Sequence, residues 1–462
     1  GENPIKSAYL VYESDFVSCH NKTYIYNYDL LKGLKRRGTF VLNCPWKVEE
    51  LNQKLPNHIK RYIKENDINF YIIDAEDIAQ EIGLGSRINM IMQAAFFKLA
   101  NVIPVEDAVK YLREFIQKTY GKKGNIVVEM NNKSVDRGIN ELVKVDIEKY
   151  LSFSEESEVR DERKEEPKFV KDIQRPMAKM EGDSLPVSAF KKMEDGTFPL
   201  GTTAYEKRGI AVLIPQWQRD KCIQCNQCSF ICPHAVIRPF LLNEEEKRNA
   251  PDTFETKSAV GKGLEGLEYR IQISPLDCTG CGNCADICPA PGKALVMVKA
   301  EKEIERQNDN WEYAVNNIKY KDNLMSKTIL KGSQFAKPLL EFHGACAGCG
   351  ETAYLKLVTQ LYGDRMMIAN ATGCSSIWGA SAPSIPYTVN WEGKGPSWAN
   401  SLFEDNAEFG LGMYVAVKQI RERLKDLMKE AIDENIDTDL NPLFSAWIEN
   451  MEDGEKSEKI SR

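Results

Sequence analysis

The sequence lacks any uninterrupted apolar run of the roughly 18 residues that a membrane helix needs. Its first 20 residues also lack the basic-then-apolar order of a secretion signal. Basic residues are not in excess either, because 61 Lys and Arg stand against 68 Asp and Glu, a formal charge of −7. General nucleic-acid binding requires a basic face. We therefore expect neither a membrane nor a nucleic acid among the partners.

Cysteine, by contrast, is abundant, and it determines the class of protein that the sequence indicates. The length of 462 residues predicts about three domains, and an apolar content of 42% is enough for hydrophobic cores. Most of the 13 cysteines lie in tight Cys-x-x-Cys clusters. A disulfide-stapled secreted protein would be smaller and would carry a secretion signal. The sequence therefore indicates an intracellular metalloprotein, and we expect a cytoplasmic location.

The first third of the chain alternates strand-like and helix-like segments. Short apolar runs predict strands at residues 8–12, 39–43, 69–74 and 126–130. An amphipathic stretch over residues 106–120, followed by Gly121, predicts a helix that ends there. This alternation predicts an α/β fold with a doubly wound parallel sheet.

Changes in composition divide the rest of the chain. Residues 155–166 hold seven acids and three bases and cannot bury themselves, so they predict a solvated segment. We expect an α/β domain over 1–160, an extended charged, proline-containing linker over 161–201, a ferredoxin-like α+β domain over 202–318 and the front part of another α/β domain over 319–462.

A duplicated cysteine motif carries the most specific chemistry. Cys222, Cys225, Cys228 and Cys232-Pro233 have the same spacing as a second set that begins 56 residues later, formed by Cys278, Cys281, Cys284 and Cys288-Pro289. This run is typical of two-cluster [4Fe–4S] ferredoxins, in which the fourth cysteine of each motif binds the other cluster. We therefore predict one cluster on Cys222, Cys225, Cys228 and Cys288, and the other on Cys278, Cys281, Cys284 and Cys232. The competing interpretation, a pair of zinc sites, would need neither the duplication nor the Cys-Pro ending.

A third set of cysteines lies in a glycine-rich context. Cys346 and Cys349 form one Cys-x-x-Cys pair, and Cys374 follows 25 residues later. Glycines on both sides favour close packing of the backbone around a cofactor. Three thiolates leave a [4Fe–4S] cluster one ligand short. A redox dithiol is the alternative, but it does not explain Cys374. His234, just after the first motif, is expected to be an exposed polar residue.

Five stretches together resemble the pyruvate:ferredoxin (flavodoxin) oxidoreductases, within the 2-oxoacid:ferredoxin oxidoreductase family. They are residues 15–21, the doubled cysteine motif, 344–352 (GACAGCGET), 371–379 (ATGCSSIWG) and 397–413. The resemblance implies an enzyme that splits pyruvate on thiamine diphosphate with Mg²⁺ and passes the acetyl group to coenzyme A. Electrons would leave through three [4Fe–4S] clusters to ferredoxin or flavodoxin, and the parent would be a homodimer.

The resemblance also implies roles for single residues. Cys346, Cys349 and Cys374 would be three ligands of the cluster nearest the thiamine, and Glu351 would hydrogen-bond its aminopyrimidine. Gly373 and Cys374 would form part of the thiamine pocket wall. Asn89 and Asn131 would lie near coenzyme A, at the carboxyl ends of parallel strands. The competing interpretations are a helix N-terminal acid for Glu351 and caps or turns for the two asparagines.

Other features of that family are not found in the sequence. No Gly-Asp-Gly with a downstream Asn is present to hold Mg²⁺ and the diphosphate, and the chain begins at Gly1. We therefore expect an internal fragment that lacks the N-terminal domains and the C-terminal part of the thiamine domain, and that is inactive by itself. The alternatives are a stand-alone electron-transfer module and a sister enzyme for another 2-oxoacid.

Overall fold

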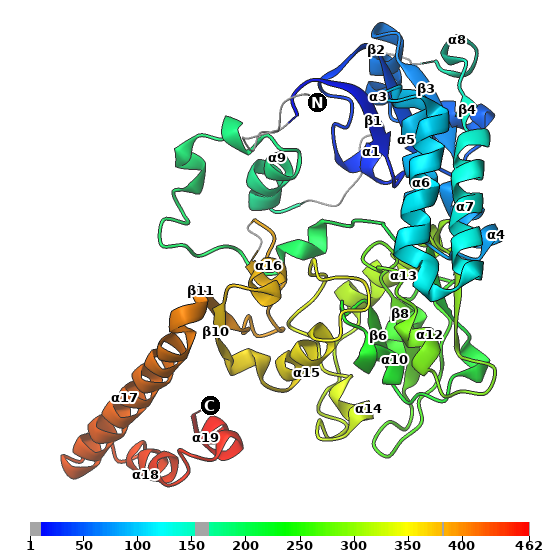
Figure 1. The fold of residues 1–462 in the computed structure, drawn as a ribbon. Coiled ribbons are helices and arrows are strands. Elements are labelled where there is room, and N and C mark those ends of the chain that lie inside the picture. The colour runs from blue at the N-terminus through cyan, green and yellow to red at the C-terminus, as the bar shows by residue number, and fades with distance from the viewer. Residues whose placement is uncertain (1–10, 153–165, 381–382, 462) are drawn as a thin grey trace.

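The computed structural model describes residues 11–152, 166–380 and 383–461, and it is a mixed α/β structure with several sheets (Figure 1). The first sheet has the order β1-β2-β3-β4. Strands β1 (Ser14–Cys19), β2 (Leu34–Asn43) and β3 (Asn69–Ile73) are parallel, and the short β4 (Val143–Lys144) is antiparallel to β3. The strands expected at 39–43 and 69–74 are thus confirmed.

Helices cover this sheet, and three of them lie side by side along it (Figure 1): α5 (Asn89–Ala100), α6 (Val105–Tyr120) and α7 (Asn125–Asn140). The helix predicted over 106–120 is α6, and Gly121 is its C-cap. Phe40 of β2 stacks on Phe70 of β3 at 5.3 Å in the core. The remaining helices of this unit are short: α1 (Tyr24–Asn27), α2 (Leu51–Lys54), α3 (Asn57–Glu65), α4 (Ala75–Ile82) and α8 (Ile147–Tyr150).

The strand predicted at 126–130 is wrong, because these residues form the beginning of α7. The helix buries Val128, Asn131, Val135 and Gly138, which recur every three or four residues. At Gly138 a Cβ would lie 2.5 Å from the Ile91 carbonyl oxygen, so the two helices touch through backbone. The strand predicted at 8–12 is not seen at residues 11 and 12, and residues 8–10 lie outside the described residues.

Short helical turns occupy the segment before the cysteine motifs. They include η3 (Val170–Gln174), α9 (Arg175–Ala178) and η6 (Thr202–Tyr205). Gln174 is buried and donates to the Thr202 carbonyl oxygen at 3.0 Å. Most of the charged run at 155–166, up to residue 165, lies outside the described residues. The domain boundaries given above stay predictions.

The cysteine-rich unit is built from two antiparallel sheets. Strand β5 (Leu213–Trp217) pairs with β9 (Leu295–Lys299), and β6 (Ile237–Leu242) pairs with β8 (Glu268–Ile273), which also pairs with the short β7 (Lys257–Ser258). Helices α10 (Gln227–Ile231) and α12 (Asn283–Ile287) each end at the fourth cysteine of a motif and pack against each other. Helices α11 (Glu244–Arg248) and α13 (Ile304–Asn317) complete the unit.

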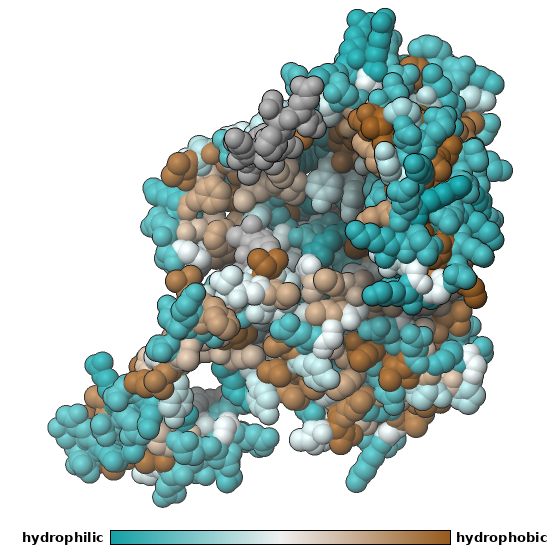
Figure 2. All heavy atoms as spheres, in the orientation of Figure 1, coloured by the Kyte–Doolittle hydropathy of each residue, from teal (hydrophilic) through white to brown (hydrophobic). Residues whose placement is uncertain are grey.

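The last part of the chain contains a small parallel pair of strands, β10 (Met367–Ala371) and β11 (Ser397–Ser401). Around them lie α14 (Leu330–Ser333), α15 (Thr352–Tyr362) and α16 (Cys374–Ala380). Helix α17 (Asn406–Asp433) leads away from the body to α18 (Asn441–Glu449) and α19 (Gly454–Ser461) (Figure 1). In the space-filling view this arm is mostly hydrophilic with apolar residues between (Figure 2). None of the described helices has the length and apolar character needed to cross a membrane.

Candidate metal centres

The two cysteine motifs share a left-handed backbone conformation at two equivalent positions. Gln224 and Asn226 adopt left-handed φ angles of 59° and 62°, and the equivalent Gly280 and Gly282 have φ angles of 71° and 83°. A left-handed conformation is costly for a residue with a side chain unless its surroundings hold it. Asn226 is held in this way, because its side chain donates to the Lys331 carbonyl oxygen at 2.9 Å and accepts from the Tyr269 hydroxyl at 2.6 Å. The duplication in sequence is therefore a duplication in structure.

The first motif surrounds a cavity together with a cysteine from the second. The thiols that line this cavity are those of Cys222, Cys225, Cys228 and Cys288, the set predicted for one cluster. Apolar side chains, including Trp217 and Tyr269, form the rest of its wall. A space lined by four thiols fits the ligand chemistry of a [4Fe–4S] cluster, which needs four thiolates around a cubane.

The second motif approaches the fourth cysteine of the first. Burial raises the pKa of Cys278 to about 12, and the neighbouring Cys232 and Cys281 thiolates oppose its ionisation further. Burial also raises the pKa of Cys284, and here Cys232 has the largest effect among the neighbouring charges. Cys232 therefore lies with the second motif, as the crossed assignment requires. Thiols in such a place ionise readily only when a metal centre compensates the charge.

Backbone N–H groups point at sulfurs in both motifs. Gln224 N–H donates to Cys222 Sγ and Gly280 N–H donates to Cys278 Sγ, each at 3.4 Å, and Ala294 N–H donates to Cys288 Sγ at 3.2 Å. Such bonds to a cluster's sulfurs are one means by which proteins set its reduction potential. Within the described ranges, no three His, Cys, Asp or Glu side chains form a group that could hold a single metal ion.

The third cysteine pair lies on a loop that contacts the second motif. A Cβ placed on Gly348, between Cys346 and Cys349, would be 3.5 Å from the Cys281 Cβ. The Gly348 backbone also lowers the pKa of Cys281, against the larger effect of burial. Cys346 is exposed and Cys349 half-buried. Cys374 lies on a separate element, as the exposed first residue of α16. The loop between Cys346 and Cys349 thus lies against Cys281 of the second motif, whereas Cys374 belongs to α16.

Two histidines hold this loop against the cysteine-rich unit. His234 was expected to be exposed, but it is 2% exposed and stacks on His343 with ring centroids 4.6 Å apart. His234 Nε2 donates to the Ala345 carbonyl oxygen at 2.9 Å, and His343 Nε2 donates to the Pro233 carbonyl oxygen at 2.7 Å. The partner residues are more than 100 positions away in the chain, so the sequence contains no local signal of the burial.

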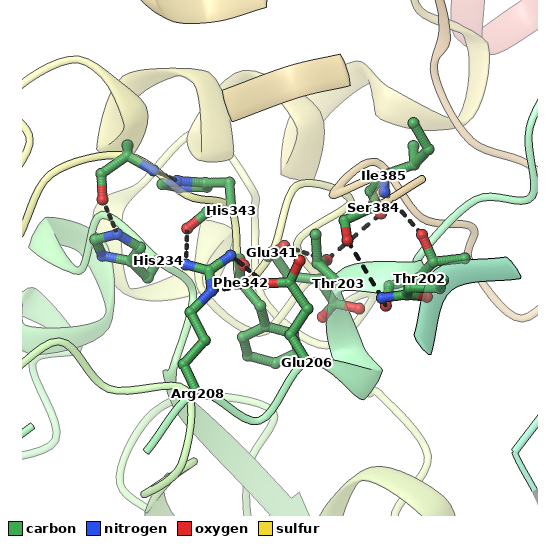
Figure 3. Close-up of polar contacts among 12 residues, drawn as sticks. Thr202, Thr203, Glu206, Arg208, His234, Glu341, Phe342, His343, Ser384 and Ile385 are labelled. Carbon is green, nitrogen blue, oxygen red and sulfur yellow. Dashed lines mark hydrogen bonds and ion pairs between the residues drawn. The ribbon is translucent and has the colours of Figure 1, made fainter. Parts of the chain in front are cut away.

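Arg208 and two threonines extend the contact between the cysteine-rich unit and the last part of the chain (Figure 3). Arg208 donates to the carbonyl oxygens of Phe342 and His343 at 3.2 and 3.1 Å. Thr203 Oγ1 donates to the Glu341 carbonyl oxygen at 2.9 Å, and Thr202 Oγ1 accepts from Ile385 N–H at 2.7 Å. These bonds hold residues 341–345 in a fixed register on the cysteine-rich unit.

The buried histidine predicts a pH-dependent stability. Burial, with smaller effects from His234 and Arg208, lowers the pKa of His343 to about 3 from an ordinary 6.5. As the pH falls below 6.5, the unfolded chain takes up a proton on this residue while the folded chain does not. The contribution of the neutral His343 to the free energy of unfolding is therefore complete above pH 6.5. It decreases toward pH 3 by about 1.4 kcal/mol per pH unit.

This expectation is measured by urea unfolding at pH 7.5 and pH 5.5 under anaerobic conditions, followed by tryptophan fluorescence. His343→Gln should weaken the dependence of the unfolding midpoint on pH, whatever it does to the midpoint at pH 7.5. Ser445→Ala, which changes no titratable group at an exposed position of α18, is the control and should keep the wild-type dependence. An unchanged dependence in His343→Gln would contradict the prediction.

The residues predicted for the thiamine site lie around the start of α15 and the end of β10. Glu351 is exposed at the N-cap of α15, and its side chain does not cap the helix. Its charge, after the larger effect of burial, raises the pKa of Tyr387. Gly373 is exposed directly before α16, and a Cβ there would meet nothing within 4 Å. An exposed carboxylate and open backbone leave room for a cofactor at this end of α15 and α16.

The two asparagines predicted to lie near coenzyme A are not brought together. Asn89 is exposed at the first position of α5. Asn131 is buried in the middle of α7, where its Nδ2 donates to the Val127 carbonyl oxygen at 2.8 Å. A pocket does open where β2 and β3 end, but neither asparagine lines it. Its walls include Trp46, Lys47, Asp74, Asp77, Arg137 and Glu141.

Several charged side chains are buried without any signal in the sequence, and two of them join distant segments. Arg238 of β6 forms an ion pair with Glu341, donates to the Tyr320 hydroxyl at 3.1 Å and lies over the Trp311 ring at 4.9 Å. Lys356 of α15 is 1% exposed and donates to backbone carbonyls of α10. Their partners are far away in the chain, so no motif reveals them.

Three family models match parts of the chain. A model described as "Pyruvate ferredoxin/flavodoxin oxidoreductase" matches residues 1–141, and one described as "4Fe-4S dicluster domain" matches residues 221–291. A third, described as "Domain of unknown function", matches residues 155–211. The 4Fe-4S dicluster model spans both of the cysteine motifs described above.

Curated relatives match the whole length of the chain. It is 56% identical to a pyruvate-flavodoxin oxidoreductase of Enterobacter agglomerans over 468 residues, which cover 100% of the chain and 39% of that protein. It is 53% identical to a pyruvate:ferredoxin oxidoreductase of Moorella thermoacetica, over 99% of the chain and 39% of that protein. It is 45% identical to a pyruvate dehydrogenase [NADP(+)] of Cryptosporidium parvum, over 100% of the chain and 26% of that protein. The chain thus spans about two fifths of the length of the first two.

Proposed function

We propose that this chain, as a member of the pyruvate ferredoxin/flavodoxin oxidoreductase family, carries the electron-transfer part of an enzyme. That enzyme oxidises pyruvate to acetyl-coenzyme A and CO₂. Electrons from that reaction pass through [4Fe–4S] clusters to ferredoxin or flavodoxin. The whole enzyme is proposed to be a cytoplasmic homodimer.

The observation that carries this proposal is the cavity between Cys222, Cys225, Cys228 and Cys288. Three of these thiols come from one motif and the fourth from the other, which is the arrangement of a two-cluster ferredoxin. Two such centres in series serve to move electrons over a distance. A separate zinc site in each motif would draw its four ligands from within that motif.

The position of the loop that carries Cys346 and Cys349 indicates the order in which the clusters would pass electrons. The loop contacts Cys281 of the second motif, and the same loop leads within two residues to Glu351 and α15. We assign Cys346, Cys349 and Cys374 to a third cluster, next to the thiamine. Electrons would pass from it to the cluster of Cys278, Cys281, Cys284 and Cys232, and then to the cluster of the first motif.

The remaining cofactors are assigned from the family. Glu351 and Gly373 are proposed to line the thiamine diphosphate site, where the cofactor would bind with Mg²⁺. Thiamine diphosphate supplies the electron sink for decarboxylation when it is bound. Glu351, exposed at the N-terminus of α15, would hold a proton in hydrogen-bond contact with that cofactor. Coenzyme A is proposed to bind the α/β unit, with Asn89 and Asn131 as its predicted contacts.

Iron, acid-labile sulfide and electron delivery together test the function. Anaerobically reconstituted protein should hold about eight irons stably, four in each ferredoxin-type cluster. After chemical reduction it should reduce added ferredoxin or flavodoxin, and more slowly as salt rises, because such encounters depend on charge. Bound zinc in place of iron would overturn the cluster assignment. Intact clusters that reduce neither acceptor would overturn the proposed partners.

A further inference from the structure

Lys356 has no role in the function as stated so far, yet it occupies an unusual place. Its side chain extends from α15 into the cysteine-rich unit and is 1% exposed. Its ammonium donates to the Ser229 carbonyl oxygen and, at 3.2 Å, to that of Phe230. Within the described part of the chain, no carboxylate forms an ion pair with it. A buried cation without a carboxylate partner is costly and usually has a specific use.

The two carbonyls belong to a turn that serves both predicted clusters. Helix α10 contains Cys228, a ligand of the first cluster, and ends at Cys232, a ligand of the second. Ser229 and Phe230 lie between these cysteines, and the Ser229 carbonyl oxygen also accepts from the Cys232 N–H at 3.2 Å. Lys356 adds a charged donor at this helix end, and it therefore places a positive charge between one ligand of each cluster.

A second set of contacts holds α15 at this position. Ser229 Oγ donates to Gln334 Oε1 at 2.9 Å, Gln334 Nε2 donates to Gln360 Oε1 at 3.1 Å, and Gln360 Nε2 donates to the Ala336 carbonyl oxygen at 2.8 Å. All three side chains are buried. This network holds α15 against α10, so the backbone of Lys356 stays beside the two carbonyls that its ammonium contacts.

Electrostatics then gives the direction of the effect. Reduction adds a negative charge to a cluster that is already negative with its four thiolates, so a nearby cation favours the reduced state. Burial lowers the pKa of Lys356 to about 8, while the Cys232 thiolate and, less strongly, the Cys228 thiolate favour its charged form. The side chain is therefore protonated at pH 7, and Cys232 is its more strongly interacting neighbour.

We propose that Lys356 is a positioning residue that raises the reduction potentials of the two clusters joined by α10, with the larger effect on the cluster bound by Cys232. This inference rests on the proposed function, because it requires both clusters to be present. The helix α15, which begins beside Glu351, thereby also sets the energy of the electron acceptors that follow the thiamine in the relay.

The test is a redox titration of the cluster-loaded protein at pH 7, followed by electron paramagnetic resonance. Lys356→Met removes the charge and keeps the length of the side chain. It should change the oxidised-to-reduced ratio of the Cys232 cluster at a given potential by roughly tenfold in favour of the oxidised form, about 59 mV for a one-electron couple. The change in the other cluster should be smaller and of the same sign. Lys356→Arg should stay close to the wild-type potentials.

A matched control comes from the α/β unit. Lys60 is also buried and also donates to a backbone carbonyl, that of Asn52 at 3.0 Å, but it lies on α3 away from the cysteines. Lys60→Met should leave both potentials unchanged. A shift of equal size in Lys60→Met would overturn the inference, since it would reflect general loosening of the protein.

The remaining outcomes of this experiment also test the inference about Lys356. Intact clusters with unmoved potentials in Lys356→Met would overturn the inference alone. Loss of clusters in Lys356→Met with retention in Lys356→Arg would support a requirement for positive charge, whereas loss in both would overturn it in favour of shape. Absence of any [4Fe–4S] signal from the wild-type protein would overturn the proposed function, and the inference with it.

Discussion

Cys288→Ser is expected to remove the cluster of the first motif, although Cys288 lies 60 residues after Cys228 in the sequence. The cavity that Cys222, Cys225 and Cys228 line is completed by the Cys288 thiol, and three thiolates leave the cubane one ligand short. The bound iron should fall by about four atoms per chain, or by about one if a three-iron centre survives. The cluster beside Cys278 should keep its spectrum.

Two matched variants sharpen this test. Cys232→Ser should give the reciprocal result, with loss at the second motif and retention at the first. Cys44→Ser replaces a buried cysteine of the α/β unit and should leave the iron content unchanged. If Cys288→Ser instead removed the cluster of its own motif, the crossed assignment would be wrong.

In the proposed enzyme, Glu351→Gln is expected to lower the rate of pyruvate-dependent electron transfer strongly while leaving the iron in place. The carboxylate is exposed at the N-cap of α15 and does not hold the helix, so its loss should not unfold the site. Removing a group that transfers a proton typically lowers the rate by roughly 10²- to 10⁴-fold. The measurement is pyruvate-dependent reduction of a viologen dye with thiamine diphosphate, Mg²⁺ and coenzyme A.

The longest protein that contains this segment should be used in that assay. Glu434→Gln, at an exposed position after α17, is the control and should keep wild-type activity and iron. Equal activity in Glu351→Gln and the wild type would remove Glu351 from the proposed site. Simultaneous loss of iron and activity would show that its role is structural.

The cysteine chemistry can be predicted from the sequence more completely than the first sheet. Ligand spacing is local, so a motif of 11 residues contains most of the geometry of each centre. The run at 126–130 resembles a strand only while its β-branched residues are considered alone. Over 16 residues, the buried positions of α7 recur at helical spacing, and that longer pattern is present in the sequence.

Other features could not have been predicted, because they depend on contacts between distant segments. The stacking of His234 on His343 and the reach of Lys356 to α10 join residues more than 100 positions apart. An isolated histidine or lysine looks the same in sequence whether it is solvated or buried. Only the packing of the last part of the chain against the cysteine-rich unit reveals these residues.

The pairing of β5 with β9 has a consequence for how such an enzyme could be assembled from parts. Leu213 lies opposite Lys299, so the chain enters and leaves the cysteine-rich unit at neighbouring points. A unit with adjacent ends can be spliced into a loop of another protein without stretching the flanking chain. The segment between these strands is therefore suited to exchange as a cassette, with Lys356 and the loop at residues 343–349 as the contacts that a new host would have to recreate.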